Sequence, residues 1–85
     1  MTKSVRAILS EVAELPCNAD ALPVDADLYR AGLKSLAVVR VMVALEREYG
    51  VEFSSDMLGR ETFSSIDSIE RALGSLRALS PTGAT

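Results

Sequence analysis

The chain has 85 residues, enough for one small domain, and a chain of this size buries only about 60% of its unfolded surface, so a deep catalytic cleft is not expected. Nine Lys and Arg residues against twelve Asp and Glu residues give a net charge of -3, which argues against nucleic-acid binding as the main role. Histidine and tryptophan are absent and Cys17 is the single cysteine, which excludes an intramolecular disulfide and any cysteine or histidine metal cluster.

Neither a signal peptide nor a membrane-spanning segment is expected from the sequence. No apolar segment is long enough to span a membrane, and residues 1–8 lack the continuous apolar core of a signal peptide. We therefore expect a cytoplasmic protein without a membrane partner. A monomeric state is also expected. Cys17 has no basic neighbour in the sequence that would activate its thiol, so it is expected to be a small, partly buried apolar residue.

Catalysis and metal binding find little support. Asp25 and Asp27 stand one residue apart, but no further oxygen ligands follow at the spacing of a calcium loop, so no metal site is expected. An acid-base set is hard to assemble without histidine in so shallow a fold. The sequence therefore predicts no enzymatic activity and no catalytic residue.

The first predicted helix covers residues 3–15. Its apolar residues recur at helical spacing: Val5, Ile8, Leu9, Val12 and Leu15. Thr2 or Ser4 would cap its N-terminus, and Pro16 would end it. Residues 16–34 are expected to form a long loop, because they are rich in proline, asparagine and aspartate. Four apolar side chains would anchor this loop to the bundle: Leu22, Val24, Leu28 and Tyr29.

The central helix is predicted over residues 36–49, with Ser35 as its N-cap and Gly50 as the residue that ends it. One apolar stripe would face the core: Val38, Val41, Met42, Leu45 and Tyr49. A second stripe lies well round the helix, beside Ser35: Leu36, Val39 and Val43. Because Arg40 and Arg47 flank the second stripe, it is predicted to be a docking surface. The alternative is a central helix that is buried on most sides.

Two more helical segments follow. A short helix is expected over residues 56–58, where Met57 and Leu58 would pack against the core. The last helix is predicted to begin at Ser64 or Ser65 and to extend no further than Leu79. Its inward stripe would be made of Ile66, Ile69, Leu73 and Leu76. Its start would be stabilised by a capping box between Ser64 and Asp67.

The predicted fold class is all-α. Three main helices plus one short helix would form a small bundle, with a long loop between the first two helices. Residues 80–85 show no apolar periodicity and are expected to form a flexible tail, which leaves a single domain over residues 1–79.

The sequence around Ser35 resembles that of the acyl carrier proteins, in which an Asp-Ser-Leu motif opens the second helix. Here the motif reads Lys34-Ser35-Leu36, with Gly32 three residues before the serine, and the resemblance extends from Leu22 through the last helix. It implies an acyl-carrier-protein-like bundle in which Ser35 bears a covalent 4'-phosphopantetheine arm, derived from coenzyme A, whose thiol holds a cargo as a thioester. The residue type fits, because a hydroxyl can form the phosphate ester and a helix N-terminus favours the attached phosphate.

The resemblance also implies partners: a phosphopantetheinyl transferase, a ligase that loads the cargo, and downstream enzymes that accept the acyl or aminoacyl group. Their interface is expected at six residues: Lys34, Leu36, Val39, Arg40, Val43 and Arg47. Carriers of fatty-acid synthesis usually present acidic residues along this helix, whereas this chain has Lys34, Ala37, Arg40 and Arg47 at the corresponding positions. Enzymes that offer basic patches to acidic carriers would therefore be repelled.

Residues 27–33 and 58–66 look more like the stand-alone carriers that receive amino acids from truncated, synthetase-like ligases. The cargo is therefore expected to be an amino acid. Two alternatives stay open: a carrier for fatty-acid or specialised acyl and polyketide synthesis, and an unmodified helical adaptor that binds a partner through the second stripe. A helix-turn-helix DNA reader would need a basic recognition helix, and the helix after Ser35 is mostly aliphatic.

Overall fold

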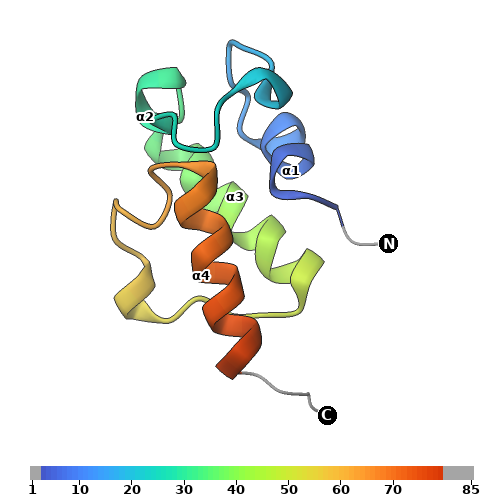
Figure 1. Cartoon of the computed structure of the whole chain (residues 1–85), viewed down its shortest axis with the longest axis vertical. Coiled ribbons are helices and arrows are strands. Elements are labelled where there is room, and N and C mark those ends of the chain that lie inside the picture. The colour runs from blue at the N-terminus through green and yellow to red at the C-terminus, as the bar shows by residue number, and fades with distance from the viewer. Residues whose placement is uncertain (1–2, 80–85) are drawn as a thin grey trace.

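The structure is a computed structural model, and it describes residues 3–79. In that range the chain forms α1 (Val5–Val12), η1 (Ala19–Ala21), α2 (Leu28–Ala31), α3 (Ser35–Tyr49), η2 (Ser55–Met57) and α4 (Ile66–Leu79), where η marks a short 3-10 helix, and it forms no strand. Helix α1 packs against α3, α4 and η1. Figure 1 shows α4 crossing in front of α3, with α1 on one side of this pair and η2 on the other.

Helix α1 is shorter than predicted. Ser4 caps it as expected, since its hydroxyl accepts a hydrogen bond from the Ala7 N–H at 3.1 Å. The helix ends at Val12 rather than at residue 15, because Glu14 has a left-handed backbone with a φ of 52°. The alternative cap Thr2 lies outside the described residues.

The segment predicted to be an irregular loop contains the short helices η1 and α2. The Asp27 carboxylate accepts hydrogen bonds from the N–H groups of Tyr29 at 2.9 Å and Arg30 at 3.4 Å, and this cap starts α2. Helix α2 was missed because four residues are too few to show a helical repeat. Its first residue, Leu28, is fully buried.

Three of the four expected loop anchors are confirmed. Leu28 is part of the core, and Leu22 and Tyr29 pack against it. Val24 is not an anchor, because its side chain is 46% exposed. Its backbone contributes instead: the Val24 carbonyl accepts a hydrogen bond from the Asp67 N–H at 2.9 Å, which ties the loop to the start of α4.

The core is apolar throughout the described residues, with no buried polar or charged side chain. It includes the inward stripe predicted for the last helix, together with Phe53 and Phe63, whose ring centroids lie 5.4 Å apart. Val41 and Leu45 of α3 are fully buried, and Val38, Met42 and Tyr49 pack against the core. The predicted core stripe of α3 is therefore confirmed.

The segment before α4 differs from expectation in two details. Residues 55–57 form a 3-10 turn, which holds Met57 against the core but leaves Leu58 49% exposed. The capping box is shifted by one residue: the Ser65 N–H donates to Ser68 Oγ at 3.0 Å, and the Ser68 N–H donates to Ser65 Oγ at 3.1 Å. The tail predicted over residues 80–85 lies outside the described residues.

Candidate prosthetic-group attachment site

Ser35 is the first residue of α3 and is exposed. The prediction that it caps the helix is wrong, because Lys34 takes the N-cap position and its side chain makes no capping hydrogen bond. A serine one residue inside the helix is not in the position from which a hydroxyl closes the first turn. The Ser35 hydroxyl therefore stands at the positive end of a 15-residue helix without serving as its cap.

The chain before Ser35 is held by a tight turn. The N–H of Gly32 donates to the carbonyl groups of Leu28 and Tyr29, and the N–H of Leu33 donates to the Leu28 carbonyl at 2.9 Å. Gly32 has a φ of 122°, a conformation that side chains disfavour. Leu33 is buried, so the turn is anchored in the core just two residues before the serine.

Helix α2, which leads into this turn, is fixed to the segment before α4. The Leu28 N–H donates to the Ser64 carbonyl at 2.7 Å, and the Tyr29 hydroxyl donates to the Arg60 carbonyl at 2.9 Å. The Arg60 guanidinium lies 3.9 Å from the centroid of the Tyr29 ring. Burial raises the pKa of the Tyr29 hydroxyl, an effect partly opposed by Arg60, so this donor stays protonated at neutral pH.

The surroundings of Ser35 fit a phosphate ester. The first intrahelical bond of α3 that reaches back to the N-cap is donated by Val38 to the Lys34 carbonyl at 3.0 Å, so the N–H groups that precede it face the helix N-terminus. These amides and the exposed Lys34 side chain favour an anion on Ser35 Oγ. The arm that such a phosphate would carry supplies a terminal thiol.

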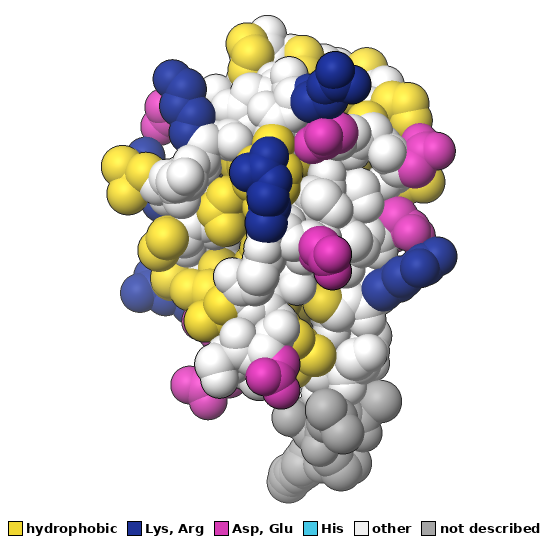
Figure 2. Space-filling model, turned by 90° about the vertical axis from the view of Figure 1, so that its left-hand side faces the viewer, with side chains coloured by type: hydrophobic (Ala, Val, Ile, Leu, Met, Phe, Trp, Pro, Cys, Tyr) yellow, Lys and Arg dark blue, Asp and Glu magenta, His cyan; other side chains and the backbone are white. Residues whose placement is uncertain are grey.

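The second stripe is exposed where it begins. Leu36 is 66% exposed and Val39 is 51% exposed, whereas Val43 is partly exposed and lies outside the core. A helix buried on most sides is therefore excluded. On the face shown in Figure 2, hydrophobic side chains lie beside Lys and Arg side chains.

The basic residues predicted for the interface are not equivalent. Arg40 Nη1 lies 3.2 Å from Glu14 Oε2, so this guanidinium forms an ion pair between α3 and the end of α1. Both side chains are exposed, and such pairs contribute little to stability. Lys34 and Arg47 are also exposed. Five of the six predicted interface residues therefore lie on α3 and Lys34 caps it, while the structure adds Glu14 beside Arg40.

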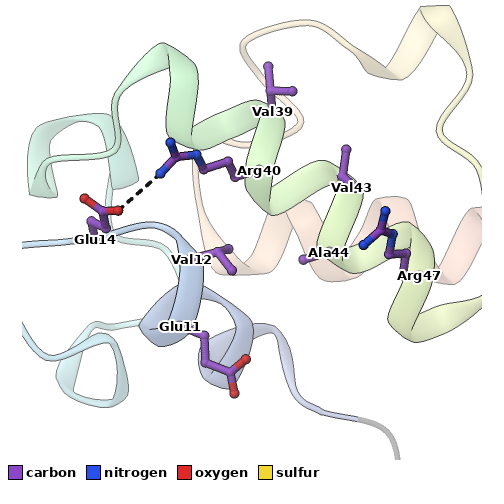
Figure 3. A pocket seen from close by; sticks show the side chains of 8 residues that line it. All are labelled: Glu11, Val12, Glu14, Val39, Arg40, Val43, Ala44 and Arg47. Atoms are coloured by element: carbon purple, nitrogen blue, oxygen red, sulfur yellow. Dashed lines mark hydrogen bonds and ion pairs between the residues drawn. The ribbon is translucent and has the colours of Figure 1, made fainter.

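A groove between α1 and α3 was not predicted from the sequence. It has a volume of about 460 Å³ and is lined by Glu11, Val12, Glu14, Val39, Arg40, Val43, Ala44 and Arg47. Figure 3 shows Val12 and Ala44 pointing toward one another between the two helices. No sequence signal identifies Glu11, Val12, Glu14 or Ala44, because their role depends on how α1 packs against α3.

Other site classes find no support in the described residues. No group of three His, Cys, Asp or Glu side chains there is arranged to hold a metal ion. Cys17 is exposed rather than partly buried, because it lies in the irregular segment after α1. Among residues 3–79, no helix combines the length and the apolar character that a membrane span requires.

Comparison with known proteins agrees with this geometry. Residues 3–73 match the family model described as a phosphopantetheine attachment site. An aminoacyl carrier protein of Agrobacterium fabrum is 40% identical over 70 residues, which covers 82% of this chain and 84% of that protein.

Solved structures are similar as well. One is a crystal structure of an engineered Bradyrhizobium japonicum glycine:[carrier protein] ligase complexed with carrier protein from Agrobacterium tumefaciens and ATP. The match has a TM-score of 0.81 and 38% identity, and it covers 84% of this chain and 92% of the matched chain. A solution structure from Agrobacterium tumefaciens matches with a TM-score of 0.71 and 36% identity, covering 87% of this chain and 89% of that one.

These matches confirm the predicted all-α carrier-protein fold. The family match spans α1, α2 and α3, and it includes Ser35 at the helix terminus that suits a phosphate ester. The chain therefore belongs to the phosphopantetheine-attachment family of carrier proteins, with 4'-phosphopantetheine as its covalent prosthetic group.

Proposed function

We propose that Ser35 bears the phosphopantetheine arm and that the chain is an aminoacyl carrier protein, which holds an amino acid as a thioester and presents it to partner enzymes. One observation carries this proposal: Ser35 is an exposed serine at the start of a long helix whose N-cap is another residue. Its hydroxyl is therefore accessible to a modifying enzyme. The N-terminal amides of α3 and Lys34 would stabilise the phosphate that results.

The amino acid is the cargo favoured by the relatives. The Agrobacterium fabrum protein is an aminoacyl carrier protein, and the carrier protein in the similar crystal structure is bound to a glycine:[carrier protein] ligase. The basic residues Lys34, Arg40 and Arg47 agree with this choice, because they would repel enzymes that recognise acidic carriers.

The proposed partners are a phosphopantetheinyl transferase, an amino acid:carrier protein ligase and the downstream enzymes that accept the aminoacyl group. Their contact surface would be the second stripe with its basic neighbours, because exposed apolar side chains rimmed by charge suit a transient interface. The protein itself would catalyse nothing. A monomeric state, a cytoplasmic location and a single domain over residues 1–79 stay predictions of the sequence.

Attachment is tested by co-expression with a broad-range phosphopantetheinyl transferase and intact-mass analysis. One arm should be added to the wild-type protein and none to Ser35→Ala. Ser75→Ala is the matched control, because Ser75 is also exposed on a helix and should leave the addition unchanged. Addition at another serine would show that Ser35 is not the attachment site, and no addition across several transferases would favour the unmodified adaptor.

The cargo is tested by loading the wild-type holo-protein. Amino acids with ATP and a synthetase-like ligase are compared with malonyl transfer from coenzyme A, and the product is identified by mass. We expect aminoacyl loading. A holo-protein that accepts malonate and no amino acid would assign it to acyl or polyketide synthesis while leaving the carrier role intact.

A further inference from the structure

The groove between α1 and α3 continues toward Ser35. A second, smaller groove of about 140 Å³ lies at the start of α3 and is lined by Ala13, Glu14, Gly32, Lys34, Leu36, Ala37 and Arg40. The two grooves share Glu14 and Arg40. The two grooves therefore adjoin at the ion pair of Glu14 and Arg40, and we call them together the trough. Its lining extends from Lys34, at the N-terminus of α3, to Arg47.

We propose that this trough is the resting site of the protein's own phosphopantetheine arm. The inference rests on the proposed attachment at Ser35. An arm attached there begins next to Lys34 and Leu36, two residues that line the near end of the trough. The occupant is therefore tethered at the mouth of its site, and its local concentration there is high.

The reach of the arm matches the trough. Its backbone of about fourteen atoms is comparable with five residues of extended chain, or roughly 16 Å. Val43 lies eight residues beyond Ser35, which is about 12 Å along the helix axis. The thiol end of the arm can therefore reach the wide part of the trough beside Val43 and Ala44.

The chemistry of the trough also matches the arm. Pantetheine is an uncharged chain of methyl and methylene groups interrupted by one hydroxyl-bearing carbon and two amides. The apolar side chains of Val12 and Ala44 lie between the helices, and Val39 and Val43 extend the apolar surface along α3 (Figure 3). Carboxylates of Glu11 and Glu14 can accept from the amide N–H groups, and the guanidinium groups of Arg40 and Arg47 can donate to the amide carbonyls.

The backbone of Glu14 supports a role for this residue. It is the one non-glycine residue with a positive φ among residues 3–79, and its carboxylate is held beside Arg40 over the point where the two grooves join. A left-handed backbone at a residue with a side chain is unfavourable and is often retained at functional positions.

An arm docked in the trough would shield the thioester at its end. A partner that docks on α3 would have to release the arm before it could act on the cargo.

The arm is followed with a spin label on its thiol. Because Cys17 is an exposed thiol, the label is placed on holo-protein in a Cys17→Ser background. Intact mass first shows that one arm and one label are present, so a failure of attachment at Ser35 is recognised before any spectrum is recorded. Broadening of backbone amide signals is then measured on nitrogen-15-labelled protein.

A docked arm should broaden the amides of Val12, Val43 and Ala44 more strongly than those of η2, which lies on the opposite side of the bundle from α1 in Figure 1. Val43→Trp should fill the trough and abolish this preference, because Val43 lies outside the core and can accept a larger side chain. Ser75→Trp, on an exposed part of α4, is the matched control and should retain it. Equal broadening on both sides of α3 in the wild-type protein would overturn the proposal.

Discussion

Gly32 packs directly against Pro16: a Cβ atom added to Gly32 would lie 2.5 Å from Cδ of the proline. The segment that follows α1 therefore touches the turn that leads into Ser35. This contact and the positive φ of Gly32 both require a residue without a side chain. The position of the proposed attachment site depends on the packing of a segment almost twenty residues away in the sequence.

Replacement of Gly32 by alanine should destabilise the fold by about 1–3 kcal/mol, because the backbone is strained and the new methyl group meets the proline ring. The free energy of unfolding in urea measures this. Gly74→Ala is the control: nothing lies within 4 Å of its added Cβ, so alanine in the interior of α4 should stabilise by about 0.5–1 kcal/mol. Equal stability of Gly32→Ala and wild type would contradict the proposed strain.

The two stripes of α3 should respond differently to truncation. Leu45→Ala removes a fully buried side chain and should cost about 2–5 kcal/mol. Val43→Ala should have a much smaller effect on stability, because Val43 lies outside the core. It should instead weaken partner binding, because Val43 belongs to the stripe predicted to be the docking surface. Denaturant melts and binding titrations separate the two effects. A Val43 variant as unstable as the Leu45 variant would mean that the second stripe belongs to the core.

The capping box at the start of α4 predicts a further difference. Ser65→Ala removes the acceptor for the Ser68 N–H and should lower the free energy of unfolding by about 0.5–2 kcal/mol. Ser75→Ala, in the exposed interior of the same helix, should be neutral or slightly stabilising. Both are compared by urea unfolding, and an unchanged Ser65→Ala would show that the cap contributes nothing.

Strain at Glu14 should be relieved by glycine. A left-handed backbone disfavours a residue with a side chain by about 1–2 kcal/mol, whereas the exposed ion pair with Arg40 is worth at most about 1 kcal/mol. Glu14→Gly should therefore equal or exceed the wild type in stability. Glu14→Ala keeps the strain and loses the ion pair, so it should be less stable than Glu14→Gly, and the reverse order would refute the strain.

Charge on α3 should determine which enzymes the carrier meets. Replacing Lys34, Arg40 and Arg47 by Glu should lower the rate of loading by the cognate ligase. It should improve binding to enzymes whose basic patches recognise acidic carriers. Rising salt should slow wild-type loading, since it screens these exposed charges. Arg71→Glu with Arg77→Glu, on α4, is the control and should load normally. Circular dichroism checks that each variant is folded.

Much of the fold could be predicted from local patterns. The apolar repeat located the core stripe of α3 around Val41 and Leu45 and the buried stripe of α4, because a regular helix presents the same face every three to four residues. Gly50 was predicted to end α3 and does so with a left-handed backbone. Ser35 was identified by its motif, and the position of a serine at the start of a helix is itself a local property.

Other features are decided by tertiary structure. The sequence did not predict the end of α1 at Val12, because that end depends on the left-handed backbone of Glu14, which lies beside Arg40. Helix α2 is held by hydrogen bonds to residues of the segment before α4. The trough exists only because α1 packs beside α3 and leaves space between their side chains. Periodicity reports which face of one helix is apolar, whereas a groove between two helices depends on the volumes and angles at which they meet.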